Sequence, residues 1–139
     1  MVILTQTDTT VGFLSQDETE LQKIKSRPST KPFIKVYKNF KVLDIRTPKS
    51  QHKILRRAKK TTFIVKNLAF RVAPDKLSSQ LLRDTQWNYS TSANEPNKKY
   101  ARDFCEQKAD IIIQDKDGLF ETEASRLFKI NRKKIRRVR

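Results

Sequence analysis

Three short polar segments of this 139-residue chain carry side chains that can bind a small anionic ligand. In the first, residues 5–12, the threonine hydroxyls of Thr7 and Thr9 flank the carboxylate of Asp8. Side chains of this kind in a turn can hydrogen-bond a polar ligand, and Asp8 can help to hold a cation. An ordinary turn rich in Thr and Asp is the alternative interpretation.

The second segment, residues 25–32, places Lys25, Arg27 and Lys31 beside two hydroxyl residues that stand between two prolines. Arginine offers a planar fork of donors and lysine a point charge, so this pattern is typical of a stiff phosphate clamp. The alternative is that Lys25 and Arg27 simply follow the end of a helix, where cations are favoured by the helix dipole.

The third segment, residues 90–96, offers the hydroxyl of Ser92 and the amide of Asn94 between an expected strand and an expected helix. Such groups can bind phosphate oxygens or a nucleoside. They can equally cap the N-terminus of the helix that follows.

Positive charge dominates the chain, which has a formal net charge of +16, and it gathers in two zones. Residues 31–60 hold eleven Lys and Arg against Asp44, and residues 126–139 hold eight Lys and Arg and no acid. Two interpretations remain open for each zone. One is a solvated surface, and the other is a footprint for polyanions, either nucleic acid or the phosphates of a nucleotide.

Several classes of chemistry are excluded by composition. Cys105 is the only cysteine and His52 the only histidine, so a disulfide framework and most zinc sites are ruled out. Two glycines cannot form a Gly-rich phosphate loop, so a phosphate site must use side-chain cations and hydroxyls. No apolar run approaches the roughly 20 residues that cross a bilayer, which predicts a cytoplasmic protein without membrane contact.

The elements that must position these segments alternate between strands and helices without a strict βαβ rhythm. This pattern predicts a single α+β domain over residues 1–139, in which helices pack on one twisted mixed sheet. A capping box over 15–18 predicts a helix that ends near Lys25, and further helices are expected over 48–60, after 74–75 and from Asn97. Strands are expected at 2–4, 33–37, 40–45, 61–65, 68–72, 87–91, 110–113, 126–130 and 135–138.

Taken in order, the polar segments resemble the motifs of the threonylcarbamoyl-AMP synthases, the YrdC/YciO-type domain. Residues 7–12 are similar to the family's Thr-(Asp/Glu)-Thr-x-(Tyr/Trp)-Gly, and residues 25–28 to its Lys-x-Arg-Pro, with Lys31-Pro32 following at the expected distance. Residues 71–72 are similar to its Arg-Val-Pro and residues 92–94 to its Ser-x-Asn. Thr62 and Ser125 fall where the family has a Thr after Pro-Gly-Pro and a Ser before a late strand.

This resemblance implies a YrdC-like domain with a concave basic face and an ATP-dependent reaction. L-threonine, bicarbonate and ATP would give threonylcarbamoyl-adenylate and pyrophosphate, and a transferase partner would pass the threonylcarbamoyl group to tRNA. Lys25 and Arg27 would be catalytic, and Mg²⁺ would arrive with ATP, with Asp8 as a weak candidate ligand. ATP and its phosphates would be held by Lys25, Arg27, Lys31, Arg71, Ser92, Asn94 and Ser125, and threonine by Thr7, Thr9 and Thr62.

The chain also departs from the family pattern. Gln6 and Ala73 stand where the family has prolines, Val11 where it has an aromatic residue, and residues 58–60 (Ala-Lys-Lys) where it has Pro-Gly-Pro. Two other functions therefore stay open: a non-catalytic relative that binds tRNA or double-stranded RNA, and a basic domain that docks a partner. The cations expected to contact RNA are Arg56, Arg57, Lys59 and Lys60, with Arg132 and Lys133 in the basic end, residues 131–139.

Overall fold

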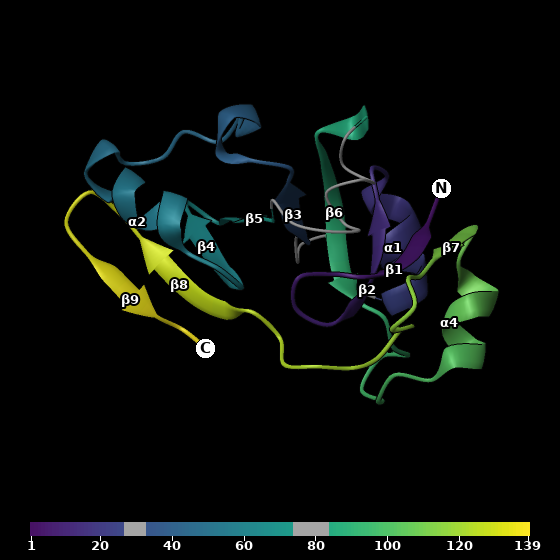
Figure 1. Cartoon of the computed structure of the whole chain (residues 1–139). Helices are drawn as coiled ribbons and strands as arrows, with labels where there is room; N and C mark the ends of the chain where they lie inside the picture. Colours follow the sequence, from purple (N-terminus) through teal and green to yellow (C-terminus); the bar gives the residue numbers. More distant parts are fainter. Residues whose placement is uncertain (27–32, 74–83) are drawn as a thin grey trace.

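One mixed sheet of nine strands runs through the computed structural model, which describes residues 1–26, 33–73 and 84–139 (Figure 1). The strands are β1 (Ile3–Gln6), β2 (Val11–Ser15), β3 (Ile34–Tyr37), β4 (Thr61–Val65), β5 (Leu68–Val72), β6 (Trp87–Ser92), β7 (Ile111–Ile113), β8 (Arg126–Ile130) and β9 (Ile135–Arg137). The helices are α1 (Glu18–Lys25), α2 (His52–Arg57) and α4 (Arg102–Lys108), with short 3₁₀ turns η1 (Phe40–Val42) and η2 (Lys49–Gln51). The predicted α+β class is confirmed.

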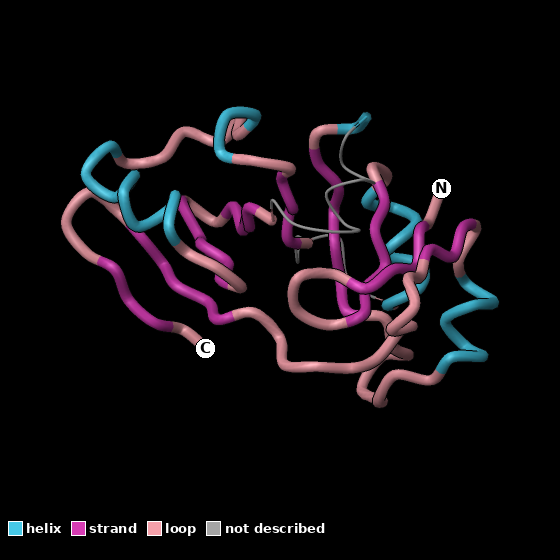
Figure 2. Tube along the Cα trace, in the orientation of Figure 1, coloured by secondary structure: helices cyan, strands magenta, loops and turns pink. Residues whose placement is uncertain are grey.

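The strands lie in the order β7-β1-β2-β6-β3-β5-β4-β8-β9, so neighbours in the sheet are often distant in the chain. Three pairs are parallel, namely β1 with β7, β3 with β5 and β4 with β8, and the remaining pairs are antiparallel. The tube in Figure 2 shows the strands β1, β2 and β7 at one end of the molecule and β4, β8 and β9 at the other. Strands β6 and β3 join these two halves.

Each half of the sheet has a hydrophobic core of its own. The first core packs α1 and α4 against the β1–β2 hairpin and contains Val2, Leu4, Val11, Phe13, Leu21, Phe33, Ala93 and Cys105. The second packs α2 against the other half and contains Tyr37, Leu55, Phe63, Val65, Phe70 and Ile130. Burial of these apolar side chains stabilises the fold, since each buried CH₂ group contributes roughly 0.8 kcal/mol to the free energy of folding.

The strands predicted over 61–65 and 68–72 are confirmed, and Lys66 and Asn67 join them in a hairpin. Both residues adopt a left-handed backbone, with φ of 47° and 68°, which is the conformation of a type I′ turn. The turn sets the register in which Phe63 faces Phe70, and their rings lie 6.1 Å apart in the second core.

One predicted helix cap and one predicted strand differ from the structure. The capping box over 15–18 does not form, because Asp17 is the N-cap residue and its carboxylate accepts from Thr19 N at 2.9 Å. The strand predicted over 40–45 is replaced by η1. There the side chain of Asn39 accepts from Val42 N at 3.1 Å and turns the backbone back on itself.

The later helices are shorter than predicted. The helix expected over 48–60 is split into η2 and α2, and within α2 Leu55 is buried whereas Ile54 is 46% exposed. The helix expected from Asn97 begins at Arg102, because Asn97 has φ 64° and leaves the helical region. The helix expected after 74–75 lies outside the described residues. Within the described ranges, every helix is too short or too polar to cross a membrane.

One polar contact anchors the second core and should make stability depend on pH. The hydroxyl of Tyr37, itself fully buried, donates a hydrogen bond to the carboxylate of Asp44. This bond, together with the charge of Lys35, lowers the pKa of Asp44 below its ordinary value of 3.8. A carboxyl with a lowered pKa stabilises the fold above its unfolded-state pKa, and this contribution is lost as the pH falls through the folded-state pKa.

We predict that Tyr37→Phe lowers the free energy of unfolding by about 1 kcal/mol at pH 7, with the difference shrinking as the pH falls below about 4. Urea unfolding of both proteins at pH 7, 5, 4 and 3 measures this. Asp44→Leu serves as the control, since Tyr37→Phe on that background should show no such pH dependence. A Tyr37→Phe effect that is constant over the whole range would contradict the assigned role of Asp44.

Candidate functional site

The first polar cluster forms where α1 ends against the loop after β6. Ser26 has φ 48° and ends the helix in the left-handed conformation, which leaves Lys25 at its last turn. The ammonium of Lys25 donates to Asn94 Oδ1 at 2.6 Å and to Ser92 O at 3.1 Å. The hydroxyl of Ser92 donates to the same Asn94 oxygen at 2.7 Å. Three residues predicted to hold phosphate are therefore in contact, although they come from distant parts of the chain.

The second cluster surrounds Arg71, which β5 carries into the space between the two cores. Its side chain is only 5% exposed and forms an ion pair with Asp8, with 3.1 Å between Nε and Oδ1. The guanidinium also reaches the hydroxyl of Thr62 at 3.4 Å. Thr62 in turn bonds the hydroxyl of Ser125 at 2.7 Å. Four residues predicted from separate motifs thus form one connected network.

The electrostatics of this network favour an anionic ligand. Burial lowers the pKa of the Arg71 guanidinium, whereas the neighbouring Asp8 carboxylate raises it. An arginine remains charged under these conditions. Asp8 neutralises the charge on the Nε side, and Nη1 reaches the hydroxyl of Thr62. The neighbouring charge of Arg139 also lowers the pKa of Arg71, so the network holds two cations against one carboxylate.

A pocket of about 150 Å³ lies between the clusters. Ser92 connects them, because it lines the pocket and contacts Lys25 and Asn94. Gly12 permits the close approach of β2, since a Cβ there would lie 3.0 Å from Thr91 O and 3.1 Å from Thr7 Cγ2. The lining residues are Thr7, Thr9, Thr10, Gly12, Ile34, Arg71, Ser90, Thr91, Ser92, Ala124, Ser125 and Arg139.

The threonines predicted to hold substrate divide between the wall and the network behind it. Thr7 and Thr9 both line the pocket, and the Thr7 hydroxyl donates to Thr10 O at 2.6 Å. Thr62 is fully buried and reaches the pocket through Ser125. Arg27 and Lys31, both assigned to phosphate, lie outside the described residues.

Sequence reasoning missed Arg139. Its guanidinium lines the pocket and donates to Ser125 O at 2.9 and 3.2 Å. The sequence shows Arg139 only as the last residue of the basic end, and its place in the pocket follows from the pairing of β8 with β9. Phe128 pairs with Arg137, so the chain two residues further on must lie near Ser125.

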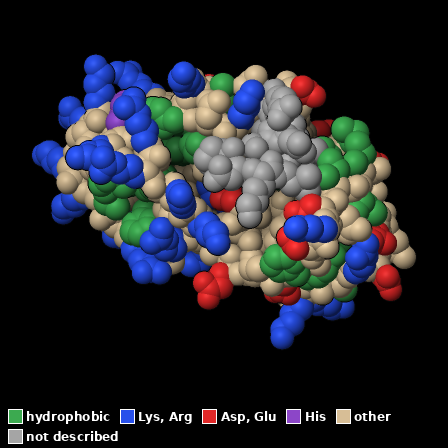
Figure 3. Space-filling model, in the orientation of Figure 1, with side chains coloured by type: hydrophobic (Ala, Val, Ile, Leu, Met, Phe, Trp, Pro, Cys, Tyr) green, Lys and Arg blue, Asp and Glu red, His purple; other side chains and the backbone are tan. Residues whose placement is uncertain are grey.

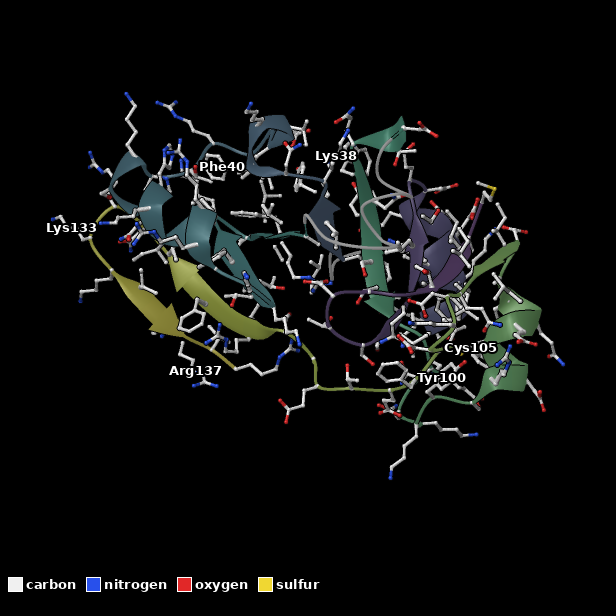
Figure 4. All side chains as sticks on the ribbon, in the orientation of Figure 1. Lys38, Phe40, Tyr100, Cys105, Lys133 and Arg137 are labelled. Carbon is white, nitrogen blue, oxygen red and sulfur yellow. The ribbon has the colours of Figure 1, made fainter. Side chains whose placement is uncertain are left out.

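Neither a resident metal nor a reactive thiol is supported by the described residues. Asp8, the candidate metal ligand, is paired with Arg71 instead. In the described part of the chain, no group of three or more His, Cys, Asp and Glu side chains comes together. Cys105 is fully buried in the first core, and burial raises the pKa of its thiol. Figure 4 shows Cys105 on α4, beside Tyr100 and far from Lys133 and Arg137.

The two basic zones meet at the end of the molecule that carries α2, β8 and β9 (Figure 3). Hydrogen bonds join them: Ser50 Oγ donates to Arg132 O at 2.9 Å, and Gln51 Nε2 donates to Asn131 O at 3.1 Å. The cations predicted to contact RNA are found here, and among the described residues none of them forms an ion pair. They are Arg56, Arg57, Lys59, Lys60, Arg132 and Lys133.

No family model matches the sequence, and no curated protein matches it as a relative. The fold, however, is similar to several solved structures. E. coli YciO superimposes with a TM-score of 0.80 at 16% identity, covering 99% of this chain and 82% of YciO. A double-alanine variant of P. abyssi Sua5 gives 0.78 at 17% identity, and P. abyssi Sua5 complexed with L-threonine gives 0.74 at 18%.

Each Sua5 comparison covers 99% of this chain but 49% of the Sua5 chain, so this chain spans about half the length of Sua5. Similarity at such low identity is a similarity of fold. It extends over nearly all of the described sheet and confirms the architecture that the motif order predicts. The chain has the YrdC-like fold that Sua5 and YciO share.

Proposed function

We propose that the chain is a threonylcarbamoyl-AMP synthase, which condenses L-threonine, bicarbonate and ATP into threonylcarbamoyl-adenylate and pyrophosphate. One observation carries this proposal. The Lys25 cluster and the Arg71 network come from six separate segments and meet at one pocket, which Arg71, Ser125 and Ser92 line and which Lys25 and Asn94 adjoin through Ser92. A solved structure of the same fold, P. abyssi Sua5, holds L-threonine, which supports threonine as the amino acid.

The proposed reaction needs no side-chain nucleophile. The amine of threonine attacks bicarbonate, forms an N–C bond and releases water, which gives a carbamate. A carbamate oxygen then attacks the α-phosphorus of ATP, and the bond to pyrophosphate breaks. Charge develops on the phosphoryl oxygens in the transition state, so fixed cationic donors accelerate the step. Lys25 and Arg71 are held in place by protein hydrogen bonds before any ligand binds.

The Lys25 cluster and the threonines of the pocket would bind different parts of the substrates. Lys25, Ser92 and Asn94 would bind phosphate oxygens, where the lysine exchanges its bond to Asn94 for one to the ligand. Thr7 and Thr9 would line the threonine and carbamate side. Arg71, Ser125 and Arg139 line the same pocket as Thr7 and Thr9 and would face the reacting carboxylate and phosphate groups. Mg²⁺ would enter with the triphosphate as part of the substrate, and the adenylate would leave for a transferase partner.

Pyrophosphate release tests the proposal. We expect purified protein to release pyrophosphate from ATP only when both threonine and bicarbonate are present. Lys25→Ala should lower kcat/KM about 100-fold, the effect of losing one donor to a developing oxyanion. Lys23→Ala is the matched control, because this exposed lysine lies on the same helix and should leave kcat/KM unchanged.

Thermal melts must accompany these assays, since Lys25 also bonds the protein. If Lys25→Ala melts like the wild type and still turns over at the wild-type rate, the catalytic assignment is wrong. If the wild type binds ATP but releases no pyrophosphate under any combination of substrates, the synthase proposal fails.

A second candidate function, RNA binding, is favoured by one feature: the cations gathered around α2, β8 and β9, for which the described residues provide no ion-pair partner. Strand β9 is exposed along its whole length, so its arginines face solvent at the edge of the sheet. A surface of this kind binds a phosphate backbone through the release of counterions. The proposed RNA is a tRNA or a double-stranded RNA, and its contacts would lie away from the pocket.

Salt-dependent tRNA binding tests this candidate. Arg136→Glu combined with Arg137→Glu should weaken binding by at least 10-fold at 100 mM salt and flatten the slope of log K against log salt. The control is Lys108→Glu with Lys116→Glu, which reverses two exposed cations near the opposite end of the sheet. If both double variants reduce tRNA binding equally, the surface around α2, β8 and β9 is not a specific RNA site.

A further inference from the structure

A second cavity, of about 280 Å³, lies beside the one proposed for catalysis and shares none of its lining residues. It opens between the β1–β2 loop, the segment that carries η1, and the end of α2. Its size is close to the roughly 300 Å³ at which small-molecule pockets begin. The lining residues are Asp8, Asn39, Phe40, Leu55, Arg56, Arg57, Ala58, Lys59, Lys60 and Val72.

The inner wall of this cavity is apolar and includes an aromatic ring. Leu55 is buried, and Phe40 and Val72 are half-buried around it. The Phe40 ring is held by His52, which meets it edge-on at 5.4 Å, and by Arg56, whose guanidinium carbon lies 5.0 Å from the ring centre. Such a wall favours a flat, weakly polar group.

The rim, in contrast, is cationic. Four exposed cations stand around the opening, and the described residues provide no ion-pair partner for any of them: Arg56, Arg57, Lys59 and Lys60. Two of them fall where the synthase pattern has an uncharged Pro-Gly-Pro, so this charge is a property of this chain. A concentration of positive charge at the mouth of a small cavity attracts an anionic group.

The backbone that carries the two lysines is fixed. Lys59 O accepts from Thr61 Oγ1 at 2.8 Å and from the guanidinium of Arg126 at 3.2 Å. Lys60 O accepts from Arg126 N at 3.0 Å. Lys60 also has φ 51°, a left-handed conformation that costs energy for a residue with a side chain. These contacts hold both lysines at the rim rather than leaving them on a loose loop.

We propose that this cavity binds a nucleoside monophosphate. The flat base would rest on the wall formed by Phe40, Leu55 and Val72, and the phosphate would lie among the rim cations. Asp8 and Asn39 line the cavity, and their side-chain oxygens, which already accept from Arg71 Nε and Val42 N, keep lone pairs that can accept hydrogen bonds from the base. A free nucleotide fits better than an RNA chain because a cavity of about 280 Å³ lies at the lower limit of small-molecule pockets.

Asp8 also separates this cavity from the first pocket. Its carboxylate holds Arg71, which lines the first pocket, while Asp8 itself lines the second. An occupant of the second cavity would therefore touch the residue that positions Arg71. Through the Asp8–Arg71 ion pair, a ligand in the second cavity would affect the first pocket without entering it.

Isothermal titration with AMP tests the proposal. The charge-reversed variant Lys59→Glu with Lys60→Glu should bind AMP at this site at least 10-fold more weakly. Ala58→Phe is an independent variant, since it fills the cavity without changing charge and its extended backbone accepts any side chain. Lys53→Glu is the matched control, because it reverses an exposed cation of α2 that does not line the cavity.

AMP binding in the first pocket must be distinguished from AMP binding in the second cavity. The double variant Ser92→Ala with Asn94→Ala does this, because it removes side chains proposed to bind phosphate at the first pocket only. We expect AMP binding at the second site to survive in this variant. Loss of all AMP binding in it, with full binding retained in the Lys59/Lys60 variant, would overturn the second site. Pyrophosphate release is assayed separately, so failure of the synthase proposal leaves this result interpretable.

Two further ligands decide what the cavity recognises. Inorganic phosphate should bind at least 10-fold more weakly than AMP, and equal affinity would show that no base is bound. A 5′-phosphorylated single-stranded oligonucleotide should compete poorly. If the oligonucleotide binds and AMP does not, and the Lys59/Lys60 variant loses that binding, the ligand is a nucleotide within RNA and the mononucleotide proposal is wrong.

Discussion

The buried guanidinium of Arg71 is the constraint that orders the centre of this molecule. A charge in a position 5% exposed is tolerated only when partners surround it, and removing one partner of a buried pair costs about 3–5 kcal/mol. Asp8 comes from the β1–β2 loop and Thr62 from β4, so both halves of the sheet must close on Arg71. The partners that the Arg71 charge requires therefore bring together the segments that form the pocket wall.

The sheet supplies the geometry that this pairing needs. Its two cores stand apart, and the strands β6 and β3 pass between them, so the middle of the sheet carries polar side chains instead of a third large core. Ser90 and Ser92 alternate along β6 and both reach the first pocket. A sheet with a core at each end thus leaves polar side chains in its middle, and the first pocket opens there.

The sequence predicted this arrangement unevenly, and the reasons are physical. The strands around Lys66-Asn67 were predicted well because alternation and turn chemistry act locally. The contact of Lys25 with Asn94 followed from motif order, but no local property of either residue indicates it. The strand over 40–45 failed because the Asn39 cap outweighed the strand propensity of its neighbours. Arg139 was missed because its role depends on hairpin register, and the cavity at Lys59 and Lys60 depends on packing among four segments.

The parallel pairs have a consequence for how the chain acquires its structure. Ile3 pairs with Ile111, and Thr61 pairs with Arg126, so β1 and β4 gain their outer neighbours only after long stretches of chain have been brought back. Closing such loops reduces entropy before any contact compensates for it, which makes folding slow. During translation, the first strand emerges long before its parallel partner exists, and its outer edge stays open to wrong pairing for that time.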